Sequence, residues 1–129
     1  MTALHDATLN PSPWVRRFAP VIPKDGAVLD LACGSGRHSL LLANLGYNVL
    51  AVDQDISNIK SLQNRLITAK AFDLEQESWP LVNLEVAGIV VTNYLYRPHL
   101  DQLPQMLQNG GVLIYETFAL GNGDFGKPS

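Results

Sequence analysis

The chain has 129 residues, enough for one domain with a hydrophobic core and too few for two, so we expect a single domain over residues 1–129. Hydrophobic residues make up 47% of it and charged residues 16%, which excludes a disordered or fibrous protein. The net charge is −3 and the pI lies near 5.4, so we expect no nucleic acid partner. No apolar stretch approaches the ~18 residues that a bilayer crossing requires, and we expect no membrane partner.

Cysteine and histidine usage bounds the compartment and the metal chemistry. The single cysteine cannot form an internal disulfide, which favours a reducing compartment, and we expect a cytoplasmic protein. The three histidines lie far apart in the sequence and show no metal-ligand spacing. We therefore expect no metal site.

The first half of the chain predicts a β-α-β unit. Residues 27–31 form a short apolar run that indicates a buried strand, followed at once by a glycine loop. Residues 37–45 have the length and leucine content of a helix that a glycine ends. A second strand is expected over 48–52, ending in Asp53, and Asp55 can cap a short helix after it.

The second half continues the alternation. Residues 98–108 are helix-like but contain Pro104, so this helix should be bent or shortened. Gly110 and Gly111 then break it, and residues 119–129 show no further strand. Three more strands are expected, over 66–72, 86–92 and 112–118.

Strands that alternate with helices at this spacing predict an α/β fold, a doubly wound parallel sheet of about five strands with helices on both faces. Such sheets bind ligands at the carboxyl ends of their strands, near the point where the strand order reverses. The residues that follow each strand are therefore the candidates for function. The core of the domain is expected over residues 27–118.

The glycine loop after the first strand is a candidate nucleoside site. Gly34 and Gly36 stand between a strand and a helix, where glycine lets the backbone approach a ligand, and Asp53 ends the next strand. The dinucleotide fingerprint has a third glycine where this chain has Ser39. Asp30 at the loop would repel a pyrophosphate and attract a cation, so a cationic nucleoside is favoured. No Gly-Lys-Ser/Thr follows, which excludes a P-loop.

Residues 28–55 closely resemble the first two motifs of the class I S-adenosylmethionine-dependent methyltransferases. The nearest likeness is to the small bacterial methyltransferases of the tellurite-resistance and quinone-biosynthesis types. The resemblance implies a Rossmann-like sheet and assigns the methionine part, the ribose, the adenine and the methyl group to successive strand ends. In that order, the implied cofactor residues are Asp30, Ala32, Cys33, Gly34 and Gly36; Asp53; Gln54, Asp73 and Leu74; and Asn93.

Each of these residues has a structural alternative. Asp30 could brace the loop, and Asp53 and Asp73 could be ordinary turn acids. Cys33 is expected to be a small buried filler rather than a nucleophile, because no histidine lies near it in the sequence. His38, in the first turn of the expected helix, is assigned a solvated or packing role ahead of ligand contact.

The acceptor side is less defined. Thr92-Asn93-Tyr94-Leu95 lacks the prolines of the Asn-Pro-Pro-Tyr motif of enzymes that methylate base amino groups, so a DNA substrate is not supported. Tyr94 and Tyr96 either line an acceptor pocket or cover apolar surface. His99 and Tyr94 are the candidates for a general base, and no catalytic residue is assigned. Ahead of the core, Trp14, Arg16 and Arg17 belong either to a lid over the cofactor or to surface packing.

The resemblance implies methyl transfer to a small-molecule acceptor, with S-adenosylhomocysteine as the product. Two alternatives stay open: a cofactor-binding module without activity and, disfavoured by Asp30 and Ser39, an NAD-dependent oxidoreductase. Members usually have seven strands, the last two an antiparallel pair that this sequence lacks, so we expect a truncated product of a longer parent. The strand at 112–118 would then leave an apolar edge unpaired, which predicts self-association as a homo-oligomer.

Overall fold

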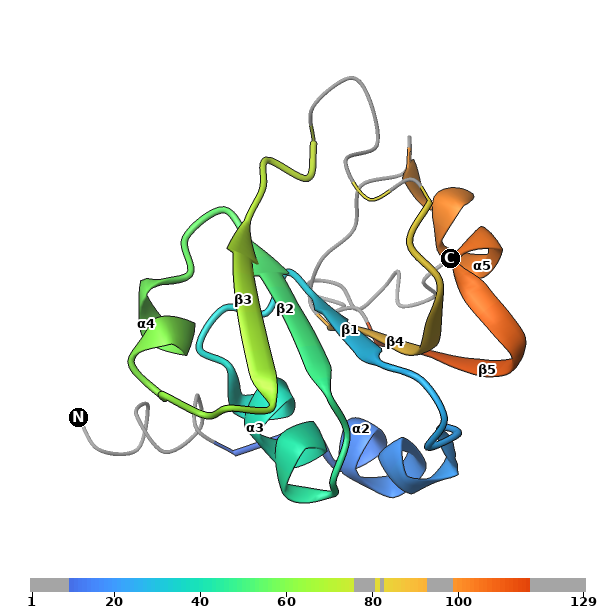
Figure 1. Ribbon diagram of the computed structural model, residues 1–129, viewed down its shortest axis with the longest axis horizontal. Coiled ribbons are helices and arrows are strands. Elements are labelled where there is room, and N and C mark those ends of the chain that lie inside the picture. The colour runs from blue at the N-terminus through green and yellow to red at the C-terminus, as the bar shows by residue number, and fades with distance from the viewer. Residues whose placement is uncertain (1–9, 76–80, 82, 93–98, 117–129) are drawn as a thin grey trace, which may run out of the picture.

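The computed structural model describes residues 10–75, 81, 83–92 and 99–116. Five strands form one sheet in the order β3-β2-β1-β4-β5, and every neighbouring pair is parallel. The predicted α/β fold with a doubly wound parallel sheet is confirmed (Figure 1). The strands are β1 (Val28–Leu31), β2 (Val49–Asp53), β3 (Ile67–Ala71), β4 (Val86–Thr92) and β5 (Leu107–Glu116).

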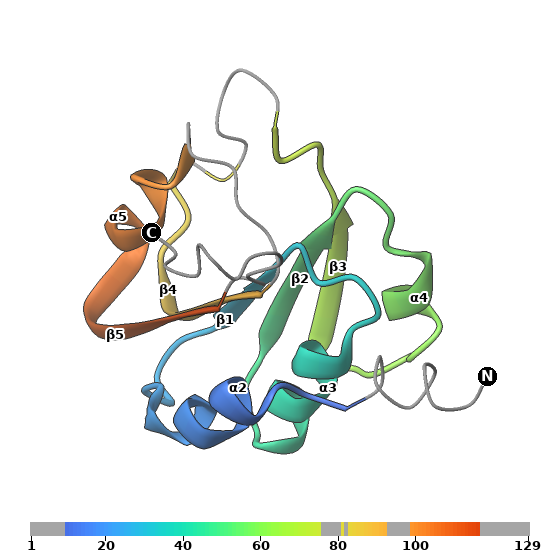
Figure 2. The ribbon, with the colours of Figure 1, turned by 180° about the vertical axis from the view of Figure 1, so that it is seen from behind.

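Short helices connect and flank these strands. Helices α2 and α3 lie side by side on one side of the sheet, whereas α5 lies beside β5 (Figures 1 and 2). Among the described residues, no helix is long and apolar enough to cross a membrane. The helices are α2 (Pro13–Phe18), α3 (Arg37–Asn44), α4 (Ser57–Lys60) and α5 (Gln102–Gln105), and a 3₁₀ turn, η1 (Ala19–Val21), follows α2.

The sheet divides the core into two layers because side chains alternate along each strand. Val28, Val49 and Val90 pack with residues of α2 and α3 in one cluster. Ile59 of α4 packs on Ala51 at the edge of that layer. The opposite layer is covered by α5 and by Leu74, Leu81 and Leu84, and its buried members include Leu29, Leu31, Val52, Ile89, Val91 and Leu103.

Helix α2 was not predicted from the sequence. Ser12 caps it, because its hydroxyl accepts hydrogen bonds from the amides of Trp14 and Val15, and Pro13 occupies the first helical position. Val15 is fully buried against the sheet, whereas Trp14 remains 46% exposed. Six residues give too short a pattern for helical periodicity to show, so the capping serine and proline were the only local signals.

The predicted start of the fifth strand was wrong. Strand β5 begins at Leu107, five residues earlier than expected, and Gly110 and Gly111 lie inside it rather than before it. A register shift against β4 absorbs the extra residues, since Val86 pairs with Leu107 but Gly88 pairs with Val112. The expected helix over 98–108 is correspondingly shortened to α5, as its proline predicted.

Tyr47 fastens the segment α2-η1 to the sheet. Its side chain is buried, and its hydroxyl lies 2.6 Å from the carbonyl oxygen of Ile22 and 3.0 Å from that of Ala19. Tyr47→Phe should lower the free energy of unfolding by about 1–2 kcal/mol, because the one hydroxyl proton that the two buried carbonyl oxygens share is lost while the ring is retained. Urea unfolding followed by circular dichroism measures this, and an unchanged midpoint would show that the hydroxyl contributes nothing.

Candidate functional site

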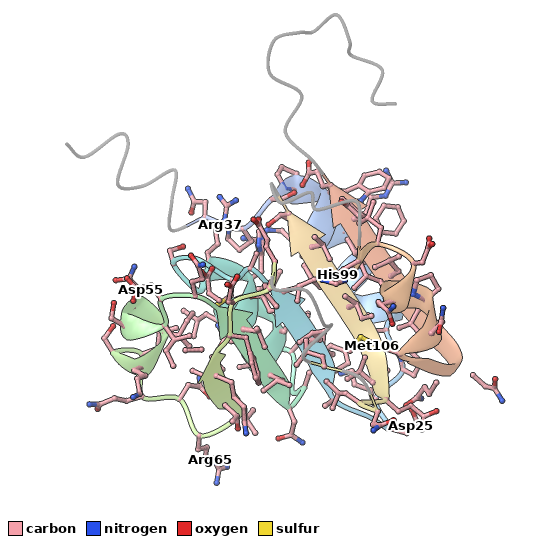
Figure 3. All side chains as sticks on the ribbon, turned by 90° about the horizontal axis from the view of Figure 1, so that it is seen from above. Asp25, Arg37, Asp55, Arg65, His99 and Met106 are labelled. Carbon is pink, nitrogen blue, oxygen red and sulfur yellow. The ribbon has the colours of Figure 1, made fainter. Side chains whose placement is uncertain are left out.

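The carboxyl ends of the five parallel strands meet at one edge of the sheet. Figure 3 shows Arg37 and Asp55, which follow β1 and β2, at one end of the sheet, and Asp25 and Arg65, which precede β1 and β3, at the other. Strand β1 has β2 on one side and β4 on the other, so the strand order reverses between β1 and β4. That reversal is the position where sheets of this type bind ligands.

The loop between β1 and α3 bends through three residues with positive φ: Ala32 at 58°, Gly34 at 56° and Gly36 at 89°. A Cβ on Gly34 would have no atom within 4 Å, so its backbone is open to an approaching ligand. A Cβ on Gly36 would meet the terminal methyl group of Ile59, and the φ of 89° strains any residue that has a Cβ, so that position favours glycine. The loop thus packs against Ile59 of α4 at Gly36 and is open to an approaching ligand at Gly34.

Ala32 is the strained position of this loop, since a Cβ disfavours the left-handed conformation by about 1–2 kcal/mol. Ala32→Gly should therefore raise the free energy of unfolding by about 0.5–1 kcal/mol, after the greater flexibility of glycine in the unfolded chain is deducted. Thermal unfolding of the two proteins side by side measures the difference. A lower melting temperature for the variant would show that the methyl group contributes packing that outweighs the strain.

Asp53 connects the end of β2 to this loop. Its Oδ2 accepts a hydrogen bond of 2.8 Å from the backbone N–H of Gly34, and its Oδ1 accepts one of 2.7 Å from the N–H of Gln54. Oδ1 also accepts a longer hydrogen bond of 3.4 Å from the N–H of Asp55, and since each carboxylate oxygen has two lone pairs, Oδ2 can still accept a hydroxyl. The structure thus brings the predicted ribose acid and the predicted loop into direct contact.

Asp30 lies under the loop rather than at its mouth. It is 1% exposed, and the hydroxyl of Ser39 in α3 donates a 2.6 Å hydrogen bond to its Oδ2. Burial raises the pKa of this carboxyl to about 7, although the hydrogen bonds from Ser39 and the charge of Arg37 lower it. The bracing role is therefore observed, and contact with a ligand ammonium stays a prediction. The hydrogen bond to Asp30 also gives Ser39 a structural function that the sequence analysis missed.

The other predicted cofactor residues lie at the same edge where the structure describes them. Gln54 and Asp73 are exposed, Leu74 is buried, and the N–H of Phe72 donates to the carbonyl of Asp53, which sets Asp73 beside β2. Asn93, Tyr94 and Tyr96 lie outside the described residues. Their predicted roles, and that of the buried His99 as a general base, stay predictions.

Cys33 behaves as the expected filler. Its side chain is 7% exposed and packs with Ala51 and Ile59. Burial, followed by the charges of Asp30 and Asp53, raises the pKa of its thiol to about 12, so the thiolate is not populated at neutral pH. No group of three or more histidine, cysteine or acidic side chains is gathered for a metal anywhere in the described ranges.

A second set of polar residues, Ser12, His38, Thr92 and Glu116, meets where β4 and β5 end; we name it the β4–β5 polar cluster. His38 is 2% exposed, and burial, with a smaller contribution from Arg37, lowers its pKa to about 4. Its expected packing role is therefore found. The sequence analysis missed Glu116, whose signal was a lone acid at the end of an apolar strand.

A parallel sheet reversing between β1 and β4, with a glycine loop joined to an acid on β2, is the arrangement of the class I S-adenosylmethionine-dependent methyltransferases. The family model of the tellurite resistance protein TehB matches residues 15–107. The chain belongs to the TehB family.

Individual relatives agree with this assignment. A curated relative, the TehB of Haemophilus influenzae (strain 10810), described as a probable S-adenosyl-L-methionine-dependent methyltransferase, is 29% identical over an alignment of 119 residues that covers 84% of this chain and 36% of that protein. The chain therefore spans about a third of the length of that relative.

Two solved structures show the same fold. The CcbJ methyltransferase of Streptomyces caelestis superposes with a TM-score of 0.66 at 17% identity, over 84% of this chain and 50% of that one. The glycopeptide N-methyltransferase MtfA, complexed with S-adenosyl-L-methionine, does so with a TM-score of 0.58 at 22% identity, over 77% and 51%.

Proposed function

We propose that this chain binds S-adenosylmethionine at the carboxyl edge of β1 and β2 and transfers its methyl group to a small-molecule acceptor. The observation that carries the proposal is the 2.8 Å hydrogen bond between Asp53 and the Gly34 amide, which joins the carboxylate at the end of β2 to an open glycine loop. The net charge of −3 favours a small molecule over nucleic acid as the acceptor. The single cysteine, Cys33, forms no disulfide within the chain, which is in keeping with a cytoplasmic location.

The residues present fit this cofactor. Asp53 would accept the ribose hydroxyls, the open backbone at Gly34 would lie against the methionine part, and Asp30 beneath the loop would attract its positive charge. The cofactor, when bound, supplies an activated methyl group. The protein's part is to align donor with acceptor and to exclude water, which requires no Ser-His-Asp set.

A dinucleotide is the competing ligand. Its pyrophosphate would lie above the loop, over the carboxylate of Asp30, and α3 carries Ser39 in the place of the third glycine. We therefore expect NADH at millimolar concentration to leave S-adenosylhomocysteine bound. Displacement of S-adenosylhomocysteine by NADH in a competition titration would instead favour an oxidoreductase.

A cofactor-binding module without activity is the second alternative. It is distinguished by incubating the chain with tritiated S-adenosylmethionine and a panel of amines, thiols, phenols and oxyanions. Methylated product above the level of an Asp53→Ala control establishes the enzyme. Tight cofactor binding with no product from any class of acceptor would support the binding module.

We also propose that a second copy of this chain pairs with the outer edge of β5. An apolar groove of about 360 Å³ runs along this edge, lined by Trp14, Phe18, Val21 and residues 112–115. No described strand pairs with that edge, and its residues 107–115 carry no charge. The opposite edge, β3, is short and carries an exposed Lys70, which discourages pairing.

Val21→Glu should therefore shift the chain toward monomer in sedimentation velocity at micromolar concentration, because Val21 is 62% exposed on the groove. Leu40→Glu is the matched control, since Leu40 is an exposed apolar residue of α3 away from the groove. A wild-type chain that is monomeric at 100 μM would overturn the pairing.

A further inference from the structure

The β4–β5 polar cluster sets a carboxylate level with the end of β4. Thr92 and Glu116 are register partners on neighbouring parallel strands, so their backbones lie about 5 Å apart. The hydroxyl of Ser12 donates a hydrogen bond of 2.5 Å to Oε1 of Glu116. Because this partner is a neutral hydroxyl, the contact orients the carboxylate without forming an ion pair.

His38 orients the rest of the cluster. The N–H of Ser12 donates to Nε2 at 2.9 Å, so Nε2 is unprotonated and the proton of the neutral ring lies on Nδ1. Nδ1 faces Oγ1 of Thr92 at 3.4 Å. His38 thus holds both Ser12 and the end of β4, and it is a positioning residue for Glu116 through Ser12.

The direction of the bound cofactor places this cluster at its reactive end. Asp53, the ribose acid, ends β2, and the glycine loop ends β1. Strands β4 and β5 lie on the opposite side of β1 from β2. The sulfonium joins the ribose to the methionine part, so a nucleoside held at β2 with its methionine part at the loop would have its sulfonium near the end of β1, next to the end of β4.

We propose that Glu116 faces the methyl-transfer position and selects an acceptor that bears an amine; this inference rests on the proposed function. In the transfer, the amine lone pair forms the N–CH₃ bond while the S–CH₃ bond breaks and its electron pair stays on sulfur. The amine attacks in its neutral form, and the product is an N-methylammonium that keeps its proton and pairs with the carboxylate of Glu116. A carboxylate at this position favours the positive charge that develops on nitrogen during transfer and remains on the product.

The test compares two defined ligands by calorimetric titration. Sinefungin carries a protonated amine on a carbon that replaces the methylated sulfur, whereas S-adenosylhomocysteine is uncharged there. The wild-type chain should bind sinefungin at least about fivefold more tightly, and Glu116→Gln should reduce that preference to less than about twofold with the affinity for S-adenosylhomocysteine unchanged. The same preference in both proteins would overturn the inference.

Two further variants separate charge from folding. Ser12→Ala removes the hydroxyl partner but keeps the charge, so a partial preference for sinefungin should remain, and Glu116→Asp should restore part of it. If all three variants weaken both ligands equally, the cluster only braces α2 and the inference fails. If neither ligand binds to the wild-type chain, the proposed function itself fails.

Discussion

Asp53→Ala is expected to weaken the binding of S-adenosylhomocysteine by about 10- to 100-fold, since it removes a charged hydrogen-bond acceptor for the ribose, worth about 1.5–3 kcal/mol. The carboxylate is already held by the amides of Gly34 and Gln54, so no ordering cost accompanies ligand binding. Calorimetric titration of both proteins at the same pH and salt measures the ratio of their dissociation constants.

The matched control is Asp55→Ala, which changes the net charge equally two residues away. Asp55 is exposed and bonds to Ser57 at the start of α4, so its loss should change the affinity less than about threefold. Asp53→Asn guards against a folding defect, because its amide oxygen can still accept from Gly34. Equal weakening by the Asp53 and Asp55 variants would mean that general charge, and not the ribose contact, governs binding.

Asp30→Asn is expected to stabilise the chain at pH 8 while weakening cofactor binding. The folded-state pKa of Asp30 is raised from 3.8 to about 7, so the folded state holds a proton that the unfolded state loses. Below pH 4 the wild-type chain therefore bears no cost for a buried charge on Asp30. Its free energy of unfolding falls as the pH rises from about 4 to about 7, and the contribution of Asp30 is constant above that. About three pKa units correspond to at most about 4 kcal/mol, which asparagine removes because it is uncharged and can still accept from Ser39.

Thermal unfolding from pH 4 to 8 measures this difference between variant and wild type, in which the contribution of His38 cancels. The gap in stability between Asp30→Asn and the wild-type chain should widen between pH 4 and 7. Ser39→Ala provides a control of opposite sign, because it leaves the buried carboxylate without its hydroxyl donor and should destabilise the chain at pH 8. A gap that does not change with pH would contradict a buried, ionisable Asp30.

The parts of the fold with strong local patterns could be predicted from the sequence. Strand β4 was predicted at its observed bounds because seven apolar or β-branched residues mark a strand buried on both faces. The ends of β1 and β2 followed from the glycine loop and from Asp53. Since parallel strands share one edge, the meeting of Asp53 with Gly34 could be anticipated, although not its hydrogen bond.

The misses come from interactions distant in sequence. Strand β5 starts early because pairing with β4 overrides the breaking tendency of Gly110 and Gly111. The burial of Asp30 depends on the side chain of Ser39, nine residues away. The link from Ser12 to Glu116 spans 104 residues, so no local pattern could reveal it.

The measurement that tests the central claim most directly is calorimetric titration of the purified chain with S-adenosylhomocysteine, beside a parallel titration with NADH. We expect S-adenosylhomocysteine to bind at one site with a micromolar dissociation constant, which is a binding free energy of about −8 kcal/mol, and we expect no heat from NADH. Binding of NADH, or the absence of binding by S-adenosylhomocysteine to a folded chain, would contradict it.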